Sequence, residues 1–317
     1  MIKLKRYENN PIISPVKTRA WEAKATFNPG VVKINNKVYI LYRAMSNDNT
    51  SCLGLAVSGN GFDIDEREES PFYFPRERFE TKMKGNKNTG CEDPRLTLIN
   101  DRIYMCYTAV GEADIAIRVA LTSISKADFV KRRCGWEKPR LISPAGTWDK
   151  NACLLERKVK NKYVFFHRIF PDIWIDFKDS LDNIGWVLGH RYINAGKNSW
   201  DDDRIGIACP PIYTKEGWIL IYHGRSSRDN SYRLGAMLLD RENPCNVISR
   251  LDYPILEPEE WYERRGLTDA VVFSCGCAVL NNEVFVYYGA ADTYVCVATV
   301  ELDELLSELT SKRFYID

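Results

Sequence analysis

The sequence carries almost no net charge and has no long apolar run. Its 317 residues include 44 Lys and Arg against 43 Asp and Glu. Such a balance argues against a role dominated by nucleic acid or membrane surfaces. No apolar run approaches the ~20 residues that a membrane span needs, and the opening MIKLKRYENN lacks the apolar core of a secretory signal. We therefore expect a cytoplasmic protein with no nucleic-acid partner and no membrane partner.

Motifs for metals and cofactors are also scarce. The chain has only three histidines and no Gly-rich phosphate loop. Its ten cysteines, without an export signal, are more consistent with thiols than with a disulfide framework. Cys275 and Cys277 lie two residues apart, but zinc sites usually add a second such pair or nearby histidines. We expect no metal and no cofactor.

What the chain does contain is a repeated unit. Each unit has an apolar strand, a short polar turn and a second strand that ends in aromatic residues. The turns carry the Asn, Asp and Gly that hairpins favour. A third strand-like segment follows, and three units add a fourth short motif. The aromatic residues that close the second strands lie about 56 to 66 residues apart: Tyr42, Tyr107, Phe166, Tyr222 and Tyr288.

Five such units predict an all-β fold, a five-bladed β-propeller of four-stranded blades. The early segment NPIISP, Asn10–Pro15, resembles the fourth motif of later units. We expect it to supply the outer strand of the last blade and close the ring. Consecutive β-sandwiches are the alternative, but they leave the fivefold regularity and the displaced NPIISP unexplained. We find no linker, which predicts a single domain over residues 1–317. A short C-terminal helix is predicted by leucines at helical spacing: Leu302, Leu305, Leu306 and Leu309.

Polar residues recur where a propeller would bring strand ends together. In each blade the start of the first strand and the end of the second meet at one rim. The first-strand starts carry Asn28, Asp93, Lys150, Asn151, Cys209, Pro210 and Asp269. The second-strand ends carry Arg43, Thr108, His167, Arg168, His223, Gly224 and Arg225, with Asp292 just beyond. Arg118 opens a third strand and should approach the same rim. Each residue alone is an ordinary strand end, but their convergence predicts a concave polar site.

Asp93 is the candidate acid of this site. Asn28 and Asp93 are equivalent, since each precedes a proline and lies fourteen residues ahead of its unit's tyrosine. Inverting glycoside hydrolysis needs two carboxyl groups. We expect Glu92 to point to the opposite face, because adjacent residues of a strand alternate. No second carboxylate is obvious near Asp93, although Asp269 or Asp292 could still supply a base.

Cations, in contrast, are plentiful around the expected rim. An anionic nucleophile needs no general base, and inorganic phosphate is such a nucleophile. A cationic pocket would bind phosphate and orient it for attack. One acid beside a phosphate pocket is typical of a phosphorylase. The candidate cations are Arg43, Arg118, Lys150 and Arg168, with His167 and His223.

Several motifs together resemble the glycoside hydrolase family 130 mannoside phosphorylases, over essentially the whole chain. They are FNPGVV with LYRA, GCEDPRLT with YMCYTA, WDKNACLLERKVKNKYVFFHR, GWILIYHG, YRLGAMLLD, YPILEPEEWYE and VYYGAADT. One departure is Cys91, where a small aliphatic residue is commoner. The resemblance implies a five-bladed propeller and reversible, inverting phosphorolysis of β-mannosides that releases α-mannose 1-phosphate.

The resemblance also implies roles for individual residues. Asp93 would be the sole catalytic acid, acting directly or through a hydroxyl of the bound mannose. His223 would face the acceptor sugar. Mannose recognition falls on Asn28, Arg43 and Asp292, and phosphate binding on Arg118, Lys150 and His167. The partners would be a β-mannoside oligosaccharide and inorganic phosphate as co-substrate.

Two rival functions use the same rim. A propeller glycosidase that uses water would need a carboxylate base on the first blade, where this chain has Asn28. A non-catalytic carbohydrate-binding propeller would have no use for an acid beside a cationic pocket. The sequence leaves four properties open: the β-1,2 or β-1,4 linkage, the acceptor sugar, the preferred length of the substrate and whether the protein forms a homo-oligomer.

Overall fold

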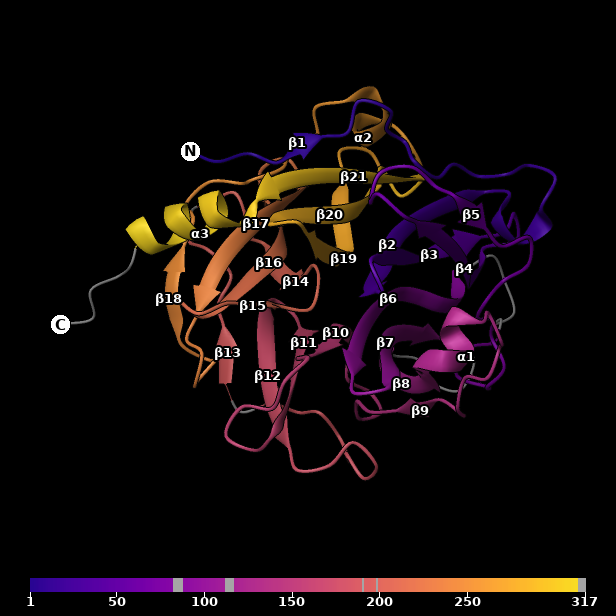
Figure 1. Cartoon of the computed structure of the whole chain (residues 1–317), viewed down its shortest axis with the longest axis horizontal. Coiled ribbons are helices and arrows are strands. Elements are labelled where there is room, and N and C mark those ends of the chain that lie inside the picture. The colour runs from indigo at the N-terminus through magenta and orange to yellow at the C-terminus, as the bar shows by residue number, and fades with distance from the viewer. Residues whose placement is uncertain (82–87, 112–116, 190, 198, 313–317) are drawn as a thin grey trace.

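The regular structure of the chain is mainly β-strands, most of them paired antiparallel, which fall into five units in chain order (Figure 1). The computed structural model describes residues 1–317 except 82–87, 112–116, 190, 198 and 313–317. Within the described part, no helix is long and apolar enough to cross a membrane.

Each unit is an up-and-down meander of short strands. The first unit contains β2 (Ala25–Ile34), β3 (Lys37–Met45), β4 (Thr50–Ser58) and β5 (Glu66–Arg67). The second contains β6 (Thr89–Ile99), β7 (Arg102–Val110), β8 (Arg118–Ser125) and β9 (Arg140–Leu141). The third contains β10 (Asp149–Leu154), β11 (Tyr163–Ile169), β12 (Asp172–Lys178) and β13 (Arg191–Ile193). The fourth contains β14 (Arg204–Ile207), β15 (Ile212–Tyr213), β16 (Trp218–Arg225), β17 (Tyr232–Leu239) and β18 (Val247–Arg250). The fifth contains β19 (Val272–Leu280), β20 (Glu283–Ala290), β21 (Tyr294–Glu301) and β1 (Lys5–Arg6).

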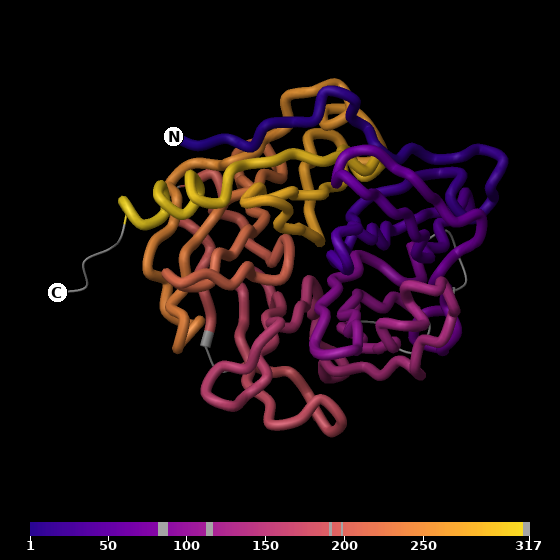
Figure 2. The backbone as a smooth tube through the Cα atoms, viewed as in Figure 1, coloured from indigo at the N-terminus to yellow at the C-terminus, as the bar shows by residue number. Residues whose placement is uncertain are grey.

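The two ends of the chain meet in the fifth unit, as expected from the sequence. β1 pairs antiparallel with β21, and Ile13 forms a further bridge with Val295. Figure 2 shows the N-terminal trace running beside the end of the chain. The expected C-terminal helix is α3 (Leu302–Ser311), which buries Leu305 and Leu309. The shorter helices are η1 (Ala20–Glu22), α1 (Lys126–Val130) and α2 (Trp261–Arg264).

The first and second units join into one sheet at a two-residue parallel contact. Thr50 pairs with Thr89, and Ser51 pairs with Gly90. Gly90 has a φ of 107°, and a Cβ on it would lie 2.1 Å from the carbonyl oxygen of Ser51. Only glycine combines this backbone conformation with so close an approach.

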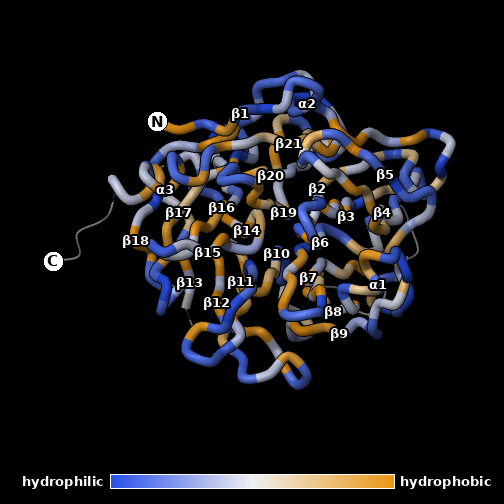
Figure 3. Tube along the Cα trace, in the orientation of Figure 1, coloured by the Kyte–Doolittle hydropathy of each residue, from blue (hydrophilic) through white to orange (hydrophobic). Residues whose placement is uncertain are grey.

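The hydrophobic core consists of apolar layers between successive units. Strands such as β3, with the sequence KVYILYRAM, are apolar on both faces because a neighbouring unit covers each face. Ile40 packs toward the fifth unit, while Leu41 packs toward the second. Other clusters join the second to the third unit, the third to the fourth, and the fourth to the fifth. The units thus follow one another around a closed circuit, with β2, β6, β10, β14 and β19 nearest its centre (Figure 1). Apolar residues run along these strands, and hydrophilic residues dominate many of the outer loops (Figure 3).

Four units carry the same buried polar contact near the end of the second strand. In each, a tyrosine hydroxyl donates to a carboxylate from the segment before the unit: Tyr42 to Glu22, Tyr107 to Glu80, Tyr222 to Asp201 and Tyr288 to Glu263. In three of them an arginine of the outermost strand binds the same carboxylate: Arg67, Arg250 and Arg6. The tyrosine contact connects the segment before the unit to its second strand. Where the arginine is present, the same carboxylate also connects to the outermost strand. The third unit has Phe166 at this position and lacks the hydroxyl.

Candidate active site

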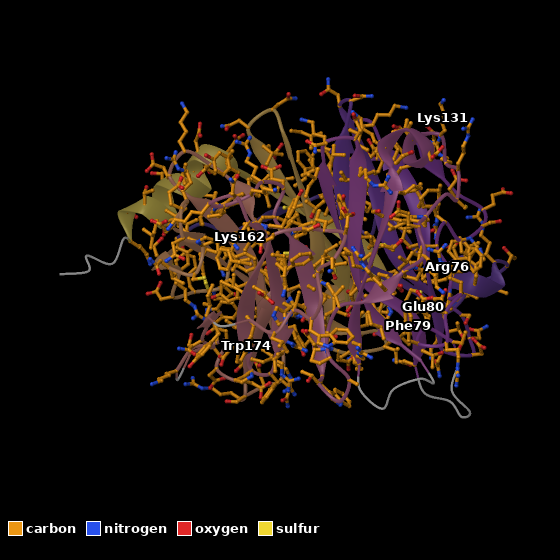
Figure 4. The ribbon with its side chains drawn as sticks, turned by 90° about the horizontal axis from the view of Figure 1, so that it is seen from below. Arg76, Phe79, Glu80, Lys131, Lys162 and Trp174 are labelled. Atoms are coloured by element: carbon orange, nitrogen blue, oxygen red, sulfur yellow. The ribbon has the colours of Figure 1, made fainter. Side chains whose placement is uncertain are left out.

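The site lies at the end of the molecule where the first strands begin. The side view places Glu80, which precedes β6, and Trp174, which pairs with His167, toward this end, away from Lys131 (Figure 4). Two further residues, Phe79 and Arg76, lie near Glu80 in the same view.

A β-bulge interrupts the first strand of each of the first three units at the same place. The pairing register shifts after Phe27, Glu92 and Lys150. The next residue has a positive φ in each case: 47° at Asn28, 53° at Asp93 and 58° at Asn151. Asn and Asp are the non-glycine residues that tolerate this conformation best. The expected equivalence of Asn28 and Asp93 is confirmed, and Asn151 extends it to the third unit.

The bulge overturns the expected orientation of Glu92. Arg43 Nη2 donates to Glu92 Oε1 at 2.6 Å, and Arg43 Nη1 donates to Asp93 Oδ1 at 3.2 Å. Both acids therefore reach one guanidinium, and the prediction that they point to opposite faces is wrong. The strict alternation of a strand fails because the extra residue and the positive φ of Asp93 rotate its side chain. Glu92 is thus a second carboxyl group beside Asp93, a position for which the sequence left Asp269 and Asp292 as candidates.

Asp93 is held in place by two donors of the first unit, Asn28 on β2 and Arg43 on β3. Asn28 Nδ2 donates to Asp93 Oδ1 at 2.9 Å. Arg43 is itself fixed, because its Nε donates to Ser51 Oγ at 3.0 Å and its guanidinium lies over the Phe27 ring. Ser51 is a positioning residue outside the quoted motifs, and Phe27 opens the motif FNPGVV, where only Asn28 had been given a role.

Burial and charge push the pKa values of the two neighbouring acids apart. Burial would raise the pKa of Asp93, but Arg43, the Asn28 hydrogen bond and the charge of Lys150 together hold it below its usual value. Burial outweighs the attraction of Arg43 at Glu92, whose pKa is raised. Asp93 is therefore the more readily ionised of the two carboxyl groups.

Asp292 and Lys150 lie within electrostatic reach of this pair. Asp292 follows β20 with a φ of 51°. Burial raises its pKa, opposed by a hydrogen bond from Thr268 and the charge of Arg43. Burial, followed by the charge of Arg168, lowers the pKa of Lys150 to about 8. The structure thus brings Asn28, Arg43, Asp93, Asp292 and Lys150 together. Asp269, the other candidate base, is exposed in the loop before β19, where it accepts from the Gly266 backbone.

His167 forms a buried pair with a residue that the sequence did not suggest. Its Nδ1 lies 2.9 Å from Asp149 Oδ2, and both side chains are fully buried. Its Nε2 faces Gly189, and within the described residues that nitrogen has no hydrogen-bond partner. Asp149 fixes the ring orientation of His167 and leaves one ring nitrogen for another group.

Arg118 lies on the outer side of the second unit's contact with the third. Its Nε donates to the Ser143 carbonyl at 2.9 Å, and its guanidinium lies over the Trp186 ring. These contacts place Arg118 at the segment that leads into the third unit, so its assignment to phosphate stays a prediction.

His223 is buried beside Asn151, and its ring lies tilted against the Phe273 ring, with centroids 4.1 Å apart. Burial, and then the charge of Arg168, hold its pKa well below the usual value, so the ring is neutral. Within the described residues, neither ring nitrogen of His223 and neither amide atom of Asn151 has a hydrogen-bond partner. Buried polar groups are normally satisfied, so this pair could serve hydroxyl groups of a ligand.

A cavity of about 320 Å³ adjoins Lys150. Arg168 and Arg204 line it together with Lys150, and Trp148 and Phe170 form apolar walls. Lys150 and Arg168 are paired across β10 and β11, which places their side chains on one face. The sequence pattern placed Arg168 at the rim and contained no signal for Arg204. For metals, the described residues contain no group of three His, Cys, Asp or Glu that could hold an ion.

The site thus holds a carboxyl group between an amide and an arginine, beside a cationic cavity. The family model of glycoside hydrolase family 130, described as β-1,4-mannooligosaccharide phosphorylase, matches residues 3–311. The chain therefore belongs to glycoside hydrolase family 130.

Relatives of known name agree with this assignment. A β-1,2-mannobiose phosphorylase of Thermoanaerobacter sp. (strain X514) is 40% identical, over 96% of this chain and 99% of that protein. A 1,2-β-oligomannan phosphorylase of the same organism is 38% identical, with the same coverage. Among solved structures, the β-1,2-mannobiose phosphorylase from Listeria innocua, in complex with β-1,2-mannobiose, is similar with a TM-score of 0.81. It is 26% identical and covers 98% of this chain and 100% of that chain.

Proposed function

We propose that this protein is an inverting β-mannoside phosphorylase that converts β-mannosides and inorganic phosphate into α-mannose 1-phosphate. The enzyme class, a glycoside phosphorylase, follows from the family and its named relatives. The observation that carries the mechanism is the cationic cavity at Lys150, within electrostatic reach of Asp93.

Asp93 is the general acid of the proposed reaction. Mannose binds at Asn28, Arg43 and Asp292, and a phosphate oxygen attacks its anomeric carbon as the glycosidic bond breaks. The leaving oxygen takes a proton that originates on Asp93, directly or through a mannose hydroxyl. In the free enzyme Arg43, Asn28 and Lys150 hold the pKa of Asp93 below its usual value. A phosphate anion bound beside Asp93 raises that pKa and favours the protonated carboxyl group that the proposed reaction needs.

The remaining ligand contacts belong to the same proposal. His223 faces the acceptor sugar, and His167 and Arg118 support phosphate together with Lys150. The pair of unsatisfied ring nitrogens on His223 and the Asp149–His167 contact support this reading. No metal and no further cofactor take part.

We propose β-1,2-linked mannosides as the substrates. The two relatives with 40% and 38% identity both carry β-1,2 names. The description of the family model refers to β-1,4-mannooligosaccharides, which makes β-1,4-linked substrates the natural comparison.

We also interpret the fold as a single domain, a five-bladed β-propeller over residues 1–317, in the cytoplasm. The closed circuit of apolar clusters between the five units and the pairing of β1 with β21 support this arrangement. A homo-oligomer remains compatible with it.

Phosphate dependence is the test. β-1,2-Mannobiose should be cleaved with phosphate to α-mannose 1-phosphate and mannose, and barely without it. Equal cleavage without phosphate would refute phosphorolysis and indicate a glycosidase that uses water. Glu92 or Asp292 would then be the general base. Binding without any cleavage would leave a carbohydrate-binding protein.

A further inference from the structure

We propose that Arg95 is a positioning residue for Asp93: it anchors the backbone of the acid across the centre of the circuit of units and places a positive charge within electrostatic reach of its carboxyl group. This inference rests on the proposed function for the catalytic role of Asp93. It adds to the site a residue that contacts Asp93 through the backbone alone.

Arg95 reaches from the second unit to the fourth. Its side chain is buried, and its Nη1 donates to the Asp93 carbonyl at 3.1 Å. Its Nε and Nη2 donate to the Ile207 carbonyl at 3.2 and 2.6 Å. The third unit lies between β6 and β14 in the circuit, so this contact crosses the centre of the molecule (Figure 1). One guanidinium therefore links the backbone that carries the acid to the backbone opposite it.

The bulge explains why Asp93 needs such an anchor. The register of β6 with β7 shifts between Glu92 and Arg95, so Asp93 lies outside the regular ladder. Its φ of 53° is unfavourable for most residues other than glycine. A backbone carbonyl that loses its ladder partner needs another donor, and Arg95 supplies it. The contact stabilises the backbone conformation that directs the Asp93 carboxyl group towards Asn28 and Arg43.

Among the three units with this bulge, only the one with the acid carries an arginine behind it. The first residue that pairs again after the bulge differs between the units, in chain order Gly30, Arg95 and Cys153. Gly30 packs against the same segment from the other side, since a Cβ on it would lie 2.3 Å from the Pro94 carbonyl oxygen. The residues that follow Asp93 are thus held between the first unit and the fourth.

The positive charge of Arg95 has no acidic partner in direct contact within the described part of the chain, where its hydrogen bonds go to backbone carbonyls. Thiols from the other four strands around it lie within electrostatic reach: Cys106, Cys153, Cys209 and Cys275. Burial raises the pKa of each thiol, so these side chains stay neutral. A buried charge without a paired acid is costly, which favours a functional role over a purely structural one.

The charge of Arg95 acts on the ionisation of Asp93. Burial raises the pKa of Asp93, but four groups together hold it below its usual value: Arg43, Asn28, Lys150 and Arg95. The carboxyl groups within electrostatic reach of Asp93 are those of Glu92 and Asp292. Loss of the Arg95 charge should therefore raise the pKa of Asp93. A lysine at position 95 would keep a charge but lack the planar fork that reaches two carbonyls.

Three variants separate the charge of Arg95 from its contacts. Arg95→Gln removes the charge, and Arg95→Lys keeps the charge without the fork. Arg6→Gln is the matched control, because Arg6 is a largely buried arginine on the outermost strand of the fifth unit, where it donates to Glu263 at 2.8 Å. The pKa of Asp93 is measured directly, by NMR titration of ¹³C-labelled aspartate carboxyl groups. Its signal is identified by its absence in Asp93→Asn. In parallel, kcat for phosphorolysis is measured against pH with both substrates saturating.

Arg95→Gln should raise the pKa of Asp93 by about 0.5–1 unit. Because phosphorolysis needs the protonated carboxyl group, the fall of kcat on the basic side should move to higher pH by a similar amount. Arg95→Lys should leave that pKa near the wild-type value and lower kcat about 10-fold or more, with little change in KM for β-1,2-mannobiose, because the acid is misplaced. Arg6→Gln should lower the melting temperature and leave both the pKa and the pH profile unchanged.

An unmoved pKa of Asp93 in Arg95→Gln, or a wild-type kcat in Arg95→Lys, would overturn the proposal and leave Arg95 a structural residue. Arg95→Lys keeps the proposal testable if Arg95→Gln does not fold. A shift of the Asp93 pKa in a protein that cleaves β-1,2-mannobiose equally well without phosphate would instead refute the proposed function and keep the link between Arg95 and Asp93.

Discussion

Glu263 joins three distant segments, and its replacement by Gln tests how the fifth unit holds the two ends of the chain together. Its fully buried carboxylate accepts Arg6 Nε at 2.8 Å, Arg6 Nη2 at 3.0 Å and the Tyr288 hydroxyl at 2.8 Å. The backbone amides of Glu259 and Glu260 donate to it at 2.8 and 3.0 Å. These contacts connect β1, β20 and the turn before α2.

Glu263→Gln keeps the shape of the side chain but removes the charge and replaces one acceptor by a donor. Removing one partner of a buried ion pair costs about 3–5 kcal/mol. Glu259→Gln is the matched control, because Glu259 binds the same Arg6 at 2.7 Å with a side chain that is 54% exposed. An exposed pair contributes about 0–1 kcal/mol. The two variants should therefore differ by at least about 2 kcal/mol in the free energy of unfolding.

Urea unfolding followed by tryptophan fluorescence, with linear extrapolation to water, measures this difference. Equal losses in the two variants would refute the reasoning, because burial would then make no difference to the contact. A loss below about 1 kcal/mol for Glu263→Gln would do the same.

The remaining predictions concern the site. Asp93→Asn should lower the turnover of phosphorolysis by about 10²–10⁴-fold in a protein that still folds. An equal or larger loss in Glu92→Gln would move the acid role to Glu92. Because the pKa of Lys150 is about 8, its charge is lost as pH rises through that value, so KM for phosphate should rise there in the wild type and stay flat in Lys150→Met. A flat wild-type profile would contradict the role of that charge. Gly206→Ala would place a Cβ 2.3 Å from His223 Nε2, so it should cost about 1–3 kcal/mol of stability and weaken sugar binding; unchanged values of both would show that the ring can move aside.

The repeat could be predicted from the sequence because each unit shows it in features that lie close together along the chain. Apolar runs, hairpin turns and closing aromatics lie within about 20 residues of one another in each unit. The return of the N-terminal segment to the last unit was also accessible, since NPIISP resembles segments found later in the chain. The strand itself is Lys5–Arg6, just before NPIISP, and Ile13 of NPIISP adds an isolated bridge to Val295. This contact between distant parts of the sequence could be inferred because the units repeat.

The buried carboxylates could not be identified in the same way. Glu80 and Asp201 lie in irregular segments before their units, and Glu22 and Glu263 lie in the short helices η1 and α2. Acids in such connections are usually solvated. Their tyrosine partners lie about 20 to 27 residues away along the chain. Arg6 adds a contact 257 residues distant from Glu263. Nothing in the local pattern separates such an acid from a surface charge.

The wrong prediction for the orientation of Glu92 also came from the local sequence pattern. In this case the sequence does contain a signal that could have corrected it. Alternation is a property of a regular strand, and the prediction assumed one through Asp93. A proline inside a run that otherwise reads as a central strand marks a bulge or an edge, and Pro94 follows Asp93 just as Pro29 follows Asn28. Interpreted as bulges, these Asn-Pro and Asp-Pro pairs would have predicted the positive φ values that the structure shows.

The repeated bulge explains how one fold can carry a single acid in a ring of similar units. Asn28, Asp93 and Asn151 share a backbone conformation, so the side chain at this position is presented to the centre three times. The first unit uses an amide there, and that amide donates to the acid of the second. A carboxylate at position 28 would instead face Asp93 across the same short contact, and two such acids would share a proton. The amide instead donates a hydrogen bond to Asp93 and adds no further like charge to those of Glu92 and Asp292, which already lie within electrostatic reach.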